Sequence, residues 1–173
     1  EYEKYVTKKC SYATFVSEKE AGLFKQLSPE VENKITYFNN GVDTEYFSPS
    51  QNFANPYKPD TRVLVFTGAM DYWPNVDAVR WFAAELFPAI CTKIPDLEFY
   101  IVGARPTKTV LELSAIPGVV VTGSVDDVRP YLAFSEIAIA PLRIARGIQN
   151  KVLEAMAMEK LVVASPQALE GIT

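Results

Sequence analysis

The chain has 173 residues, of which 49% are hydrophobic and 22% charged, and it carries a formal net charge of −4 with no histidine. This composition is that of a globular domain, and the acidic balance disfavours a nucleic-acid partner. The lack of histidine removes Ser-His and Cys-His nucleophile systems and the commonest transition-metal ligand, so the chemistry must use carboxylates, Lys, Arg, hydroxyls or backbone dipoles.

In chain order, the first 60 residues read as a short α/β piece followed by a linker. We expect a strand at 12–16, a helix at 18–27 and a strand at 34–38, before the turn-rich stretch Asn39-Asn40-Gly41-Val42-Asp43. Residues 48–60 contain three prolines and predict a linker between domains. We therefore expect the end of an N-terminal domain and a crossover at 1–47, a linker at 48–60, and a second domain at 61–173.

From residue 62 onward, short apolar runs alternate with longer amphipathic stretches. The expected strands are 62–66, 98–102, 119–122, 136–140 and 161–164, and the expected helices are 75–91, 107–114, 125–134 and 148–158. Repeated strand-helix-strand units predict an α/β fold with a Rossmann-like parallel sheet and helices on both faces. The last strand comes soon before Thr173, so we expect this domain to be truncated at its C-terminus.

Ligands of such sheets bind at the carboxyl ends of the strands, which directs attention to the glycines found there. Gly68, Gly103 and Gly123 each follow an expected strand. For Gly103 and Gly123, one interpretation is that they form tight turns, and the other is that they let the backbone approach a ligand closely. Tyr72 and Trp73 follow Gly68 and could form an aromatic platform, but packing at the rim or core is the favoured interpretation.

The stretch after the strand at 136–140 is the most informative for chemistry. A loop containing Gly147 leads into a helix that is expected to begin near residue 148, and its free N–H groups would suit a diphosphate. Arg143, Arg146 and Lys151 add positive charge around this loop, unless they simply form a solvated surface. Glu154 is either an exposed helix charge or an inward carboxylate that accepts hydrogen bonds from ribose hydroxyls.

No metal or cofactor is expected. No residues have metal-ligand spacing, and Asp126 and Asp127 are expected at a helix start, where acidic residues favour the helix dipole. Cys10 and Cys91 lie among apolar neighbours and are expected to be buried, reduced thiols. No apolar run approaches the roughly 20 residues that span a bilayer, and the chain start lacks a signal pattern. We expect a cytoplasmic protein without a transmembrane segment.

Six pieces of the chain, in order, resemble the group 1 (family 4) retaining glycosyltransferases, which have the GT-B fold. They are Asn40-Gly41-Val42-Asp43 with Phe47 and Pro49, Phe66-Thr67-Gly68, Ile101-Val102-Gly103, Val121-Thr122-Gly123-Ser124-Val125, Leu153-Glu154-Ala155-Met156-Ala157 and Glu170-Gly171. The resemblance implies that 61–173 is the donor-binding half of that fold and 1–47 the end of the acceptor domain. Residues 68–75 and 146–151 also look like a bacterial exopolysaccharide-associated branch.

The resemblance implies roles for single residues, with two departures from the family pattern. Glu154 matches the second acid of the E-x7-E motif, which binds the ribose. The first acid, which contacts the donor sugar, is replaced by Arg146, and the loop after Gly68 lacks the family's diphosphate-binding cations. Either Arg146 and Lys151 supply that charge, or the chain is inactive.

The implied function is metal-independent transfer of a sugar, with retention, from a nucleotide-diphosphate sugar to an acceptor hydroxyl. The partners are then the nucleotide sugar and a saccharide or lipid-linked saccharide, with the full protein peripheral to the inner membrane. The catalytic group is expected in the missing N-terminal domain, so this chain alone would be inactive. The main alternative is a non-catalytic nucleotide-binding module. A nicotinamide dehydrogenase would need the motif G-x-G-x-x-G after the first strand of the second domain, and this chain lacks it. A sugar-nucleotide epimerase shares the two-domain architecture, but the motif at 153–157 fits it less well than it fits a glycosyltransferase.

Overall fold

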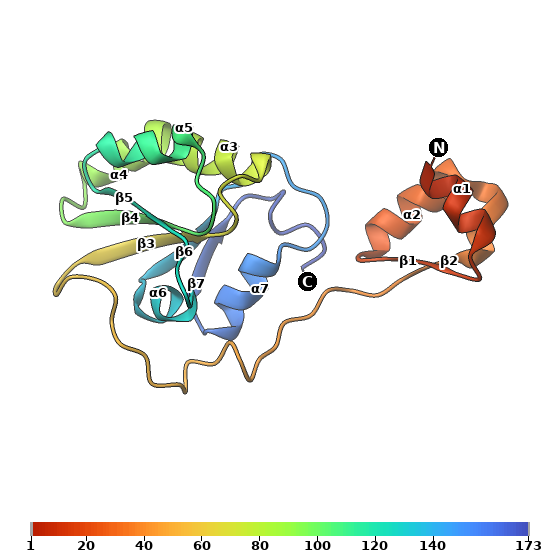
Figure 1. The fold of residues 1–173 in the computed structure, drawn as a ribbon, viewed down its shortest axis with the longest axis horizontal. Helices are drawn as coiled ribbons and strands as arrows, with labels where there is room; N and C mark the ends of the chain where they lie inside the picture. The colour runs from red at the N-terminus through yellow and green to blue at the C-terminus, as the bar shows by residue number, and fades with distance from the viewer. Residues whose placement is uncertain (1, 173) are drawn as a thin grey trace.

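A computed structural model describes residues 2–172, which form two units joined by an extended segment (Figure 1). We call residues 2–37 the N-terminal unit, residues 38–61 the crossover segment and residues 62–172 the C-terminal unit. The N-terminal unit consists of α1 (Tyr2–Lys9), β1 (Ala13–Phe15), α2 (Glu18–Leu27), the 3₁₀ helix η1 (Pro29–Lys34) and β2 (Ile35–Tyr37). Its two strands pair in parallel.

Local sequence explains α2, which has the predicted bounds. Ser17 caps this helix by accepting a hydrogen bond from the backbone N–H of Glu20 at 3.2 Å. Behind the helix lies a small core of Ala21, Val31 and Ile35. The strands are shorter than expected, α1 was not expected, and Cys10 is exposed rather than buried because α1 ends just before it.

The C-terminal unit is built on a five-stranded parallel sheet, as predicted. Its strands are β3 (Arg62–Thr67), β4 (Leu97–Val102), β5 (Val119–Gly123), β6 (Ile137–Ala140) and β7 (Leu161–Ala164). They lie in the order β5-β4-β3-β6-β7, and every neighbouring pair is parallel. The chain therefore reverses its direction of winding beside β3, which is where open α/β sheets bind their ligands.

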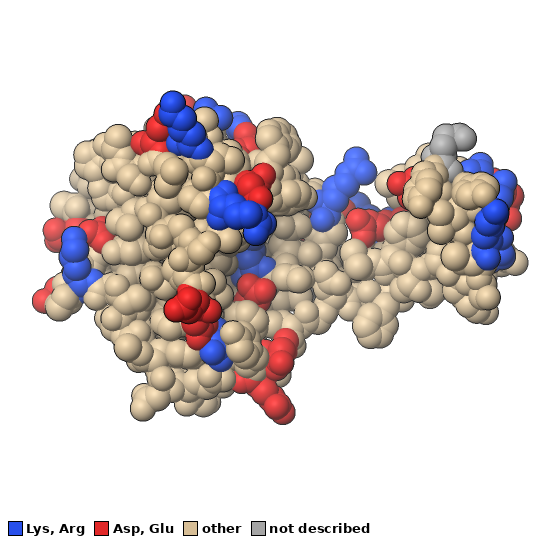
Figure 2. All heavy atoms as spheres, viewed as in Figure 1, with Lys and Arg blue, Asp and Glu red and all other residues tan. Residues whose placement is uncertain are grey.

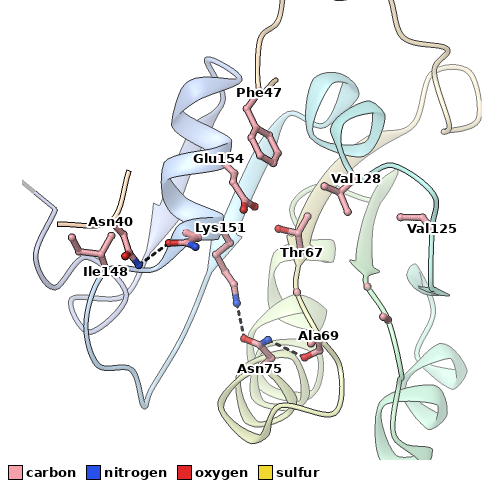
Figure 3. A pocket seen from close by; sticks show the side chains of 14 residues that line it. Asn40, Phe47, Thr67, Ala69, Asn75, Val125, Val128, Ile148, Lys151 and Glu154 are labelled. Atoms are coloured by element: carbon pink, nitrogen blue, oxygen red, sulfur yellow. Dashed lines mark hydrogen bonds between the residues drawn. The ribbon is translucent and has the colours of Figure 1, made fainter. Parts of the chain in front are cut away.

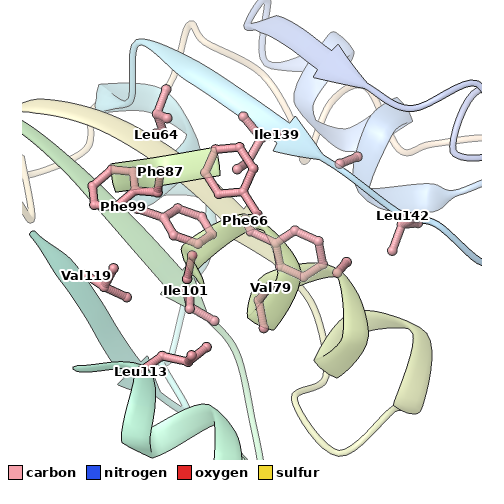
Figure 4. Close-up of a cluster of buried hydrophobic side chains, with 14 of the residues drawn as sticks. Leu64, Phe66, Val79, Phe87, Phe99, Ile101, Leu113, Val119, Ile139 and Leu142 are labelled. Carbon is pink, nitrogen blue, oxygen red and sulfur yellow. The ribbon is translucent and has the colours of Figure 1, made fainter. Parts of the chain in front are cut away.

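Both faces of the central strands β3, β4 and β6 are buried, which explains why these strands are largely apolar. Along β3 and β4, Leu64, Phe66, Phe99 and Ile101 point to one face (Figure 4), where they pack with α3 and the turns after it. The intervening strand residues point to the other face, where they pack with Leu132 of α6. Strand residues alternate between faces, so helices on both sides are required.

The expected helix at 75–91 is three consecutive helical segments. They are α3 (Trp73–Trp81), the π-helical turn η2 (Phe82–Leu86) and α4 (Phe87–Cys91). Pro88 explains the interruption, because a proline inside a helix lacks an N–H and clashes with the preceding turn. The π turn ends just before this proline and lets the chain continue.

The remaining helices are shorter than the periodicity predicted. They are α5 (Lys108–Leu111), the 3₁₀ helix η3 (Glu112–Ala115), α6 (Arg129–Phe134) and α7 (Asn150–Ala157). The helix predicted at 125–134 begins only at Arg129, so the prediction is wrong for its first four residues. Asp127 accepts a hydrogen bond from the N–H of Arg129 at 2.9 Å, which makes a turn there. Pro130 then suits the first turn of α6.

The crossover segment has no helix or strand but is packed onto the C-terminal unit. Tyr57 is buried, and its hydroxyl donates to the backbone oxygen of Tyr131 at 2.6 Å. Phe47 and Phe53 pack against the same side of the sheet. Residues 48–60, predicted as a linker, are therefore irregular but anchored.

The C-terminal unit also contacts both the N-terminal unit and the crossover segment through side chains. Lys19 forms a 3.2 Å ion pair with Glu170, and the Asn40 side chain donates to that of Asn150 at 3.1 Å. On the face drawn in Figure 2, acidic and basic atoms are interspersed.

No helix in residues 2–172 is both long and apolar enough to span a bilayer.

Candidate functional site

A cavity of about 580 Å³ lies at the carboxyl ends of β3 and β4, between these strand ends and α7 (Figure 3). Residues from the crossover segment close one side of it. The lining residues are Asn40, Phe47, Thr67, Gly68, Ala69, Asn75, Gly103, Ala104, Val125, Val128, Ile148, Asn150, Lys151 and Glu154. Four of the seven residues predicted to bind a donor are therefore together here: Gly68, Gly103, Lys151 and Glu154.

The floor of the cavity is bare backbone where the two strands end. A Cβ atom at Gly103 would lie 1.7 Å from the carbonyl oxygen of Gly68. A Cβ atom at Gly68 would in turn lie 2.8 Å from the Asn75 amide nitrogen and 3.2 Å from the Lys151 ammonium. Gly103 is thus required by a backbone contact, whereas the atoms nearest a Cβ at Gly68 are side-chain ends, and this packing brings a cation to the backbone of the loop.

Lys151 is a cation without a counter-ion. Its ammonium donates to the side-chain oxygen of Asn75 at 2.5 Å and lies 4.4 Å from the centre of the Phe66 ring. Among residues 2–172, no carboxylate forms an ion pair with it. Burial lowers the pKa of Lys151 to about 8, although the negative charge of Glu154 acts in the opposite direction.

Glu154 points into the cavity from α7, one turn after Lys151 (Figure 3). The side chain is half-buried, and within the described part of the chain it makes no hydrogen bond or ion pair. Burial raises its pKa, and the nearby Lys151 charge offsets part of this rise. Its carboxylate oxygens are therefore available to accept hydrogen bonds from a ligand.

The N-terminus of α7 opens toward the same space. Asn150 and Lys151 are its first two residues, and their backbone N–H groups have no hydrogen-bond partner among the described residues. The Gln149 side chain donates to the backbone oxygens of Arg146 and Gly147 at 3.2 and 3.1 Å, which steadies the loop before the helix. Free amide groups at a helix start favour an anion.

The other predicted site residues lie outside the cavity. Arg143 forms two hydrogen bonds with Asp77 and lies over the Trp81 ring, so it is already neutralised on the α3 side. Arg146 is exposed. Gly147 lies against the carboxylate of Glu20 in α2. The basic cluster expected around this loop is therefore dispersed, with only Lys151 turned inward.

The cavity thus combines one unpaired ammonium, one free carboxylate and several backbone groups. An unpaired buried cation beside a helix N-terminus is suited to an anionic ligand such as a phosphate group. The carboxylate is suited to hydroxyl donors. No cluster of three or more potential metal ligands occurs among residues 2–172.

The sequence of the C-terminal unit matches a known family. The family model described as glycosyl transferases group 1 matches residues 61–173, which is more than half of the chain. The chain belongs to the group 1 glycosyltransferases. A comparison with curated proteins found no match.

Solved glycosyltransferases share the fold. A sucrose-phosphate synthase from Thermosynechococcus elongatus superposes with a TM-score of 0.71 at 17% identity, covering 96% of this chain and 43% of that chain. An Anabaena HepE structure with UDP and glucose superposes with a TM-score of 0.67 at 16% identity, covering 93% of this chain and 46% of that chain. A Rickettsia africae glycosyltransferase superposes with a TM-score of 0.66 at 19% identity, covering 94% of this chain and 47% of that chain. The chain thus spans less than half the length of each, and its GT-B relationship is confirmed.

Within this group 1 glycosyltransferase chain, the sequence reasoning missed part of the site. The loop after Gly68 lacks a cation of its own, but its Asn75 amide holds the cation supplied by α7. Phe47 and Asn40 were seen as family matches but not as cavity walls. A polar residue in the first turn of the helix after Gly68 was the signal for Asn75. Asn40 and Phe47 required knowledge of the crossover path.

Proposed function

We propose that this chain binds the nucleotide part of a nucleoside-diphosphate sugar for glycosyl transfer to an acceptor hydroxyl. The observation that carries this proposal is the unpaired Lys151 ammonium beside the free N–H groups of α7. A diphosphate would supply the missing negative charge and accept from both sets of donors.

The remaining groups of the cavity then divide the nucleotide between them. The Glu154 carboxylate accepts hydrogen bonds from the two ribose hydroxyls, and Lys151 with the α7 amides contacts the diphosphate. Val125 and Val128 give an apolar wall for the base. Gly68 and Gly103 keep the floor free of side chains, so that the ligand contacts backbone.

In the transfer step, negative charge develops on the leaving diphosphate. Lys151 and the N-terminus of α7 are already placed where this charge appears, which stabilises the transition state without reorganisation. Membership of the group favours retention of anomeric configuration and a sugar acceptor, free or lipid-linked, in exopolysaccharide or cell-surface glycan synthesis. The full protein would act in the cytoplasm, peripheral to the inner membrane. This chain alone is expected to bind donor and transfer almost nothing.

Calorimetric titration of the chain with UDP, GDP, ADP and free uridine, with and without magnesium, tests this proposal. We expect micromolar to low-millimolar binding of one diphosphate, independent of magnesium, and a loss of about 10- to 100-fold in Glu154→Ala, because charge-assisted hydrogen bonds are removed. No binding of any diphosphate, or unchanged affinity in a folded Glu154→Ala variant, would contradict it.

A non-catalytic nucleotide-binding module is the second candidate, and Arg146 is the observation that favours it. This residue stands where the family has its sugar-contacting acid, and its side chain is exposed and outside the cavity. Transfer assays on the full-length protein with common donors separate the two proposals. Turnover supports the enzyme, and nucleotide binding without turnover for any donor supports the module.

A further inference from the structure

The Asn75 amide has both of its ends engaged. The side chain is only 5% exposed, its nitrogen donates to the backbone oxygen of Ala69 at 2.9 Å, and its oxygen accepts from Lys151 at 2.5 Å. A carbonyl oxygen can only accept a hydrogen bond, so the NH₂ group must face Ala69 and the amide oxygen must face Lys151. The Gly68 loop therefore sets the direction in which Asn75 presents its acceptor.

Lys151 has a second partner within its reach. Glu154 lies three residues later in α7, a spacing at which opposite charges on a helix commonly pair. The structure has no such ion pair, and Figure 3 shows the Lys151 side chain directed to Asn75 and away from Glu154. Without the amide acceptor, the long and flexible Lys151 side chain would turn to the carboxylate.

We propose that Asn75 is a positioning residue for nucleoside-diphosphate binding, which holds the Lys151 ammonium against the Gly68 loop and apart from Glu154. This inference rests on the function proposed above. Asn75 keeps two opposite charges separate, so that the ammonium meets the diphosphate and the carboxylate meets the ribose. A neutral amide serves this purpose because it orients the ammonium without cancelling its charge.

The pH dependence of diphosphate affinity reports on this arrangement. Among residues 2–172, Glu154 is the one other ionisable group that lines the cavity, and the groups that face Lys151 from α3, β3 and the Gly68 loop do not titrate. Lys151 has a pKa of about 8 in the free chain. Affinity for a diphosphate should be constant below this pH and fall as the ammonium is lost above it. Affinity for a nucleoside should not follow this curve.

Two variants change the acceptor in opposite ways, and a third is their control. Asn75→Leu removes the acceptor at similar volume, and Asn75→Asp makes it a charged one. Asn33→Asp adds the same charge at an exposed position in η1 of the N-terminal unit. Each variant is titrated with UDP and with uridine from about pH 6.5 to about pH 9.5, a range that spans the Lys151 pKa.

The two Asn75 variants should weaken UDP binding by about 10-fold near neutral pH and leave uridine binding within about 2-fold. The pH at which UDP affinity starts to fall should move up in both variants, because the ammonium then lies beside a carboxylate, which favours its charged form: Glu154 in Asn75→Leu and the introduced carboxylate in Asn75→Asp. Asn33→Asp should match the wild type. If Asn75 had a purely structural role, its loss would lower the affinity for both ligands equally and leave unchanged the pH at which UDP affinity starts to fall. This result would overturn the inference.

NMR titration of the Lys151 side chain without ligand separates this inference from the proposed function. The signal is identified by its loss in Lys151→Met. Its midpoint should shift up in both Asn75→Leu and Asn75→Asp, because in each variant the ammonium lies beside a carboxylate. An unchanged midpoint in both overturns the role of Asn75 whatever UDP does. Shifted midpoints in a chain that binds no nucleoside diphosphate overturn the proposed function and retain the hold of Asn75 on Lys151.

Discussion

The carbonyl oxygen of Gly68 lies 1.7 Å from the position that a Cβ atom at Gly103 would occupy. The ends of β3 and β4 thus touch backbone to backbone, and the N–H of Gly68 also donates to the oxygen of Val102 at 3.0 Å. This contact forms the cavity floor, because it brings two glycines without side chains together below α7. A side chain at 103 would force these loops apart.

Gly103→Ala should therefore destabilise the chain strongly, by at least about 3 kcal/mol. The matched control is Gly123→Ala, where φ is +72° but a Cβ atom would meet nothing within 4 Å. That variant should lose only about 1–2 kcal/mol, the cost of the left-handed backbone. Urea denaturation followed by circular dichroism measures both, and equal losses would contradict the close-contact argument.

Lys151 should make stability rise with pH in an alkaline window. Its pKa is about 8 in the folded chain against a usual 10.5, so between these values the unfolded chain binds one more proton than the folded chain. The free energy of unfolding should then increase by up to about 3 kcal/mol from pH 8 to pH 10.5, relative to Lys151→Met, which lacks the group. Urea denaturation across this pH range tests the prediction. If the unfolding free energies of the wild type and Lys151→Met changed with pH in parallel, the lowered pKa of Lys151 would be contradicted.

Removing positive charges should separate Lys151 from the arginines of the same loop. Lys151→Met should weaken UDP binding by about 10- to 100-fold and leave uridine binding nearly unchanged, because only the diphosphate contacts the ammonium. Arg143→Met is the control, since Arg143 is engaged by Asp77 outside the cavity. We expect it to change UDP affinity by less than about 3-fold. An equal loss in the two variants would mean that the loop rearranges to bring Arg143 inward.

Tyr57 should anchor the crossover segment through its hydroxyl. Tyr57→Phe removes the 2.6 Å hydrogen bond to Tyr131 and leaves the ring contact with Tyr100 intact. The expected loss is about 1 kcal/mol of unfolding free energy. Tyr72→Phe changes an exposed tyrosine in the same way and should cost nothing measurable. A free, unanchored segment would show no loss in either variant.

The fold was largely predictable because its central strands are buried on both faces. Runs such as Val63-Leu64-Val65-Phe66 are apolar throughout, which is typical of central strands in a parallel sheet. Helix ends were less predictable, because they depend on local groups. Asp127 and Pro130 move the start of α6 to Arg129, and Pro88 is accommodated by a π turn.

The candidate site was predictable in Gly68 and Gly103 and in the inward residues of α7, because strand ends and helical spacing place them. Charge partners could not be predicted. Arg143 and Lys151 both read as phosphate ligands, but Asp77 pairs with one and Asn75 binds the other. These contacts join residues 66 and 76 positions apart in sequence. Such pairs depend on how α3 is oriented on the sheet, which periodicity does not specify.

The central claim is that Glu154 binds the ribose of a nucleotide held in the cavity. Its most direct test is calorimetric titration of UDP and 2′,3′-dideoxy-UDP against the wild type and Glu154→Ala, which isolates the carboxylate-hydroxyl interaction as a double-mutant cycle. We predict that loss of the hydroxyls weakens binding to the wild type by about 10- to 100-fold and has no effect on Glu154→Ala. The same loss in both proteins would show that Glu154 does not contact the ribose.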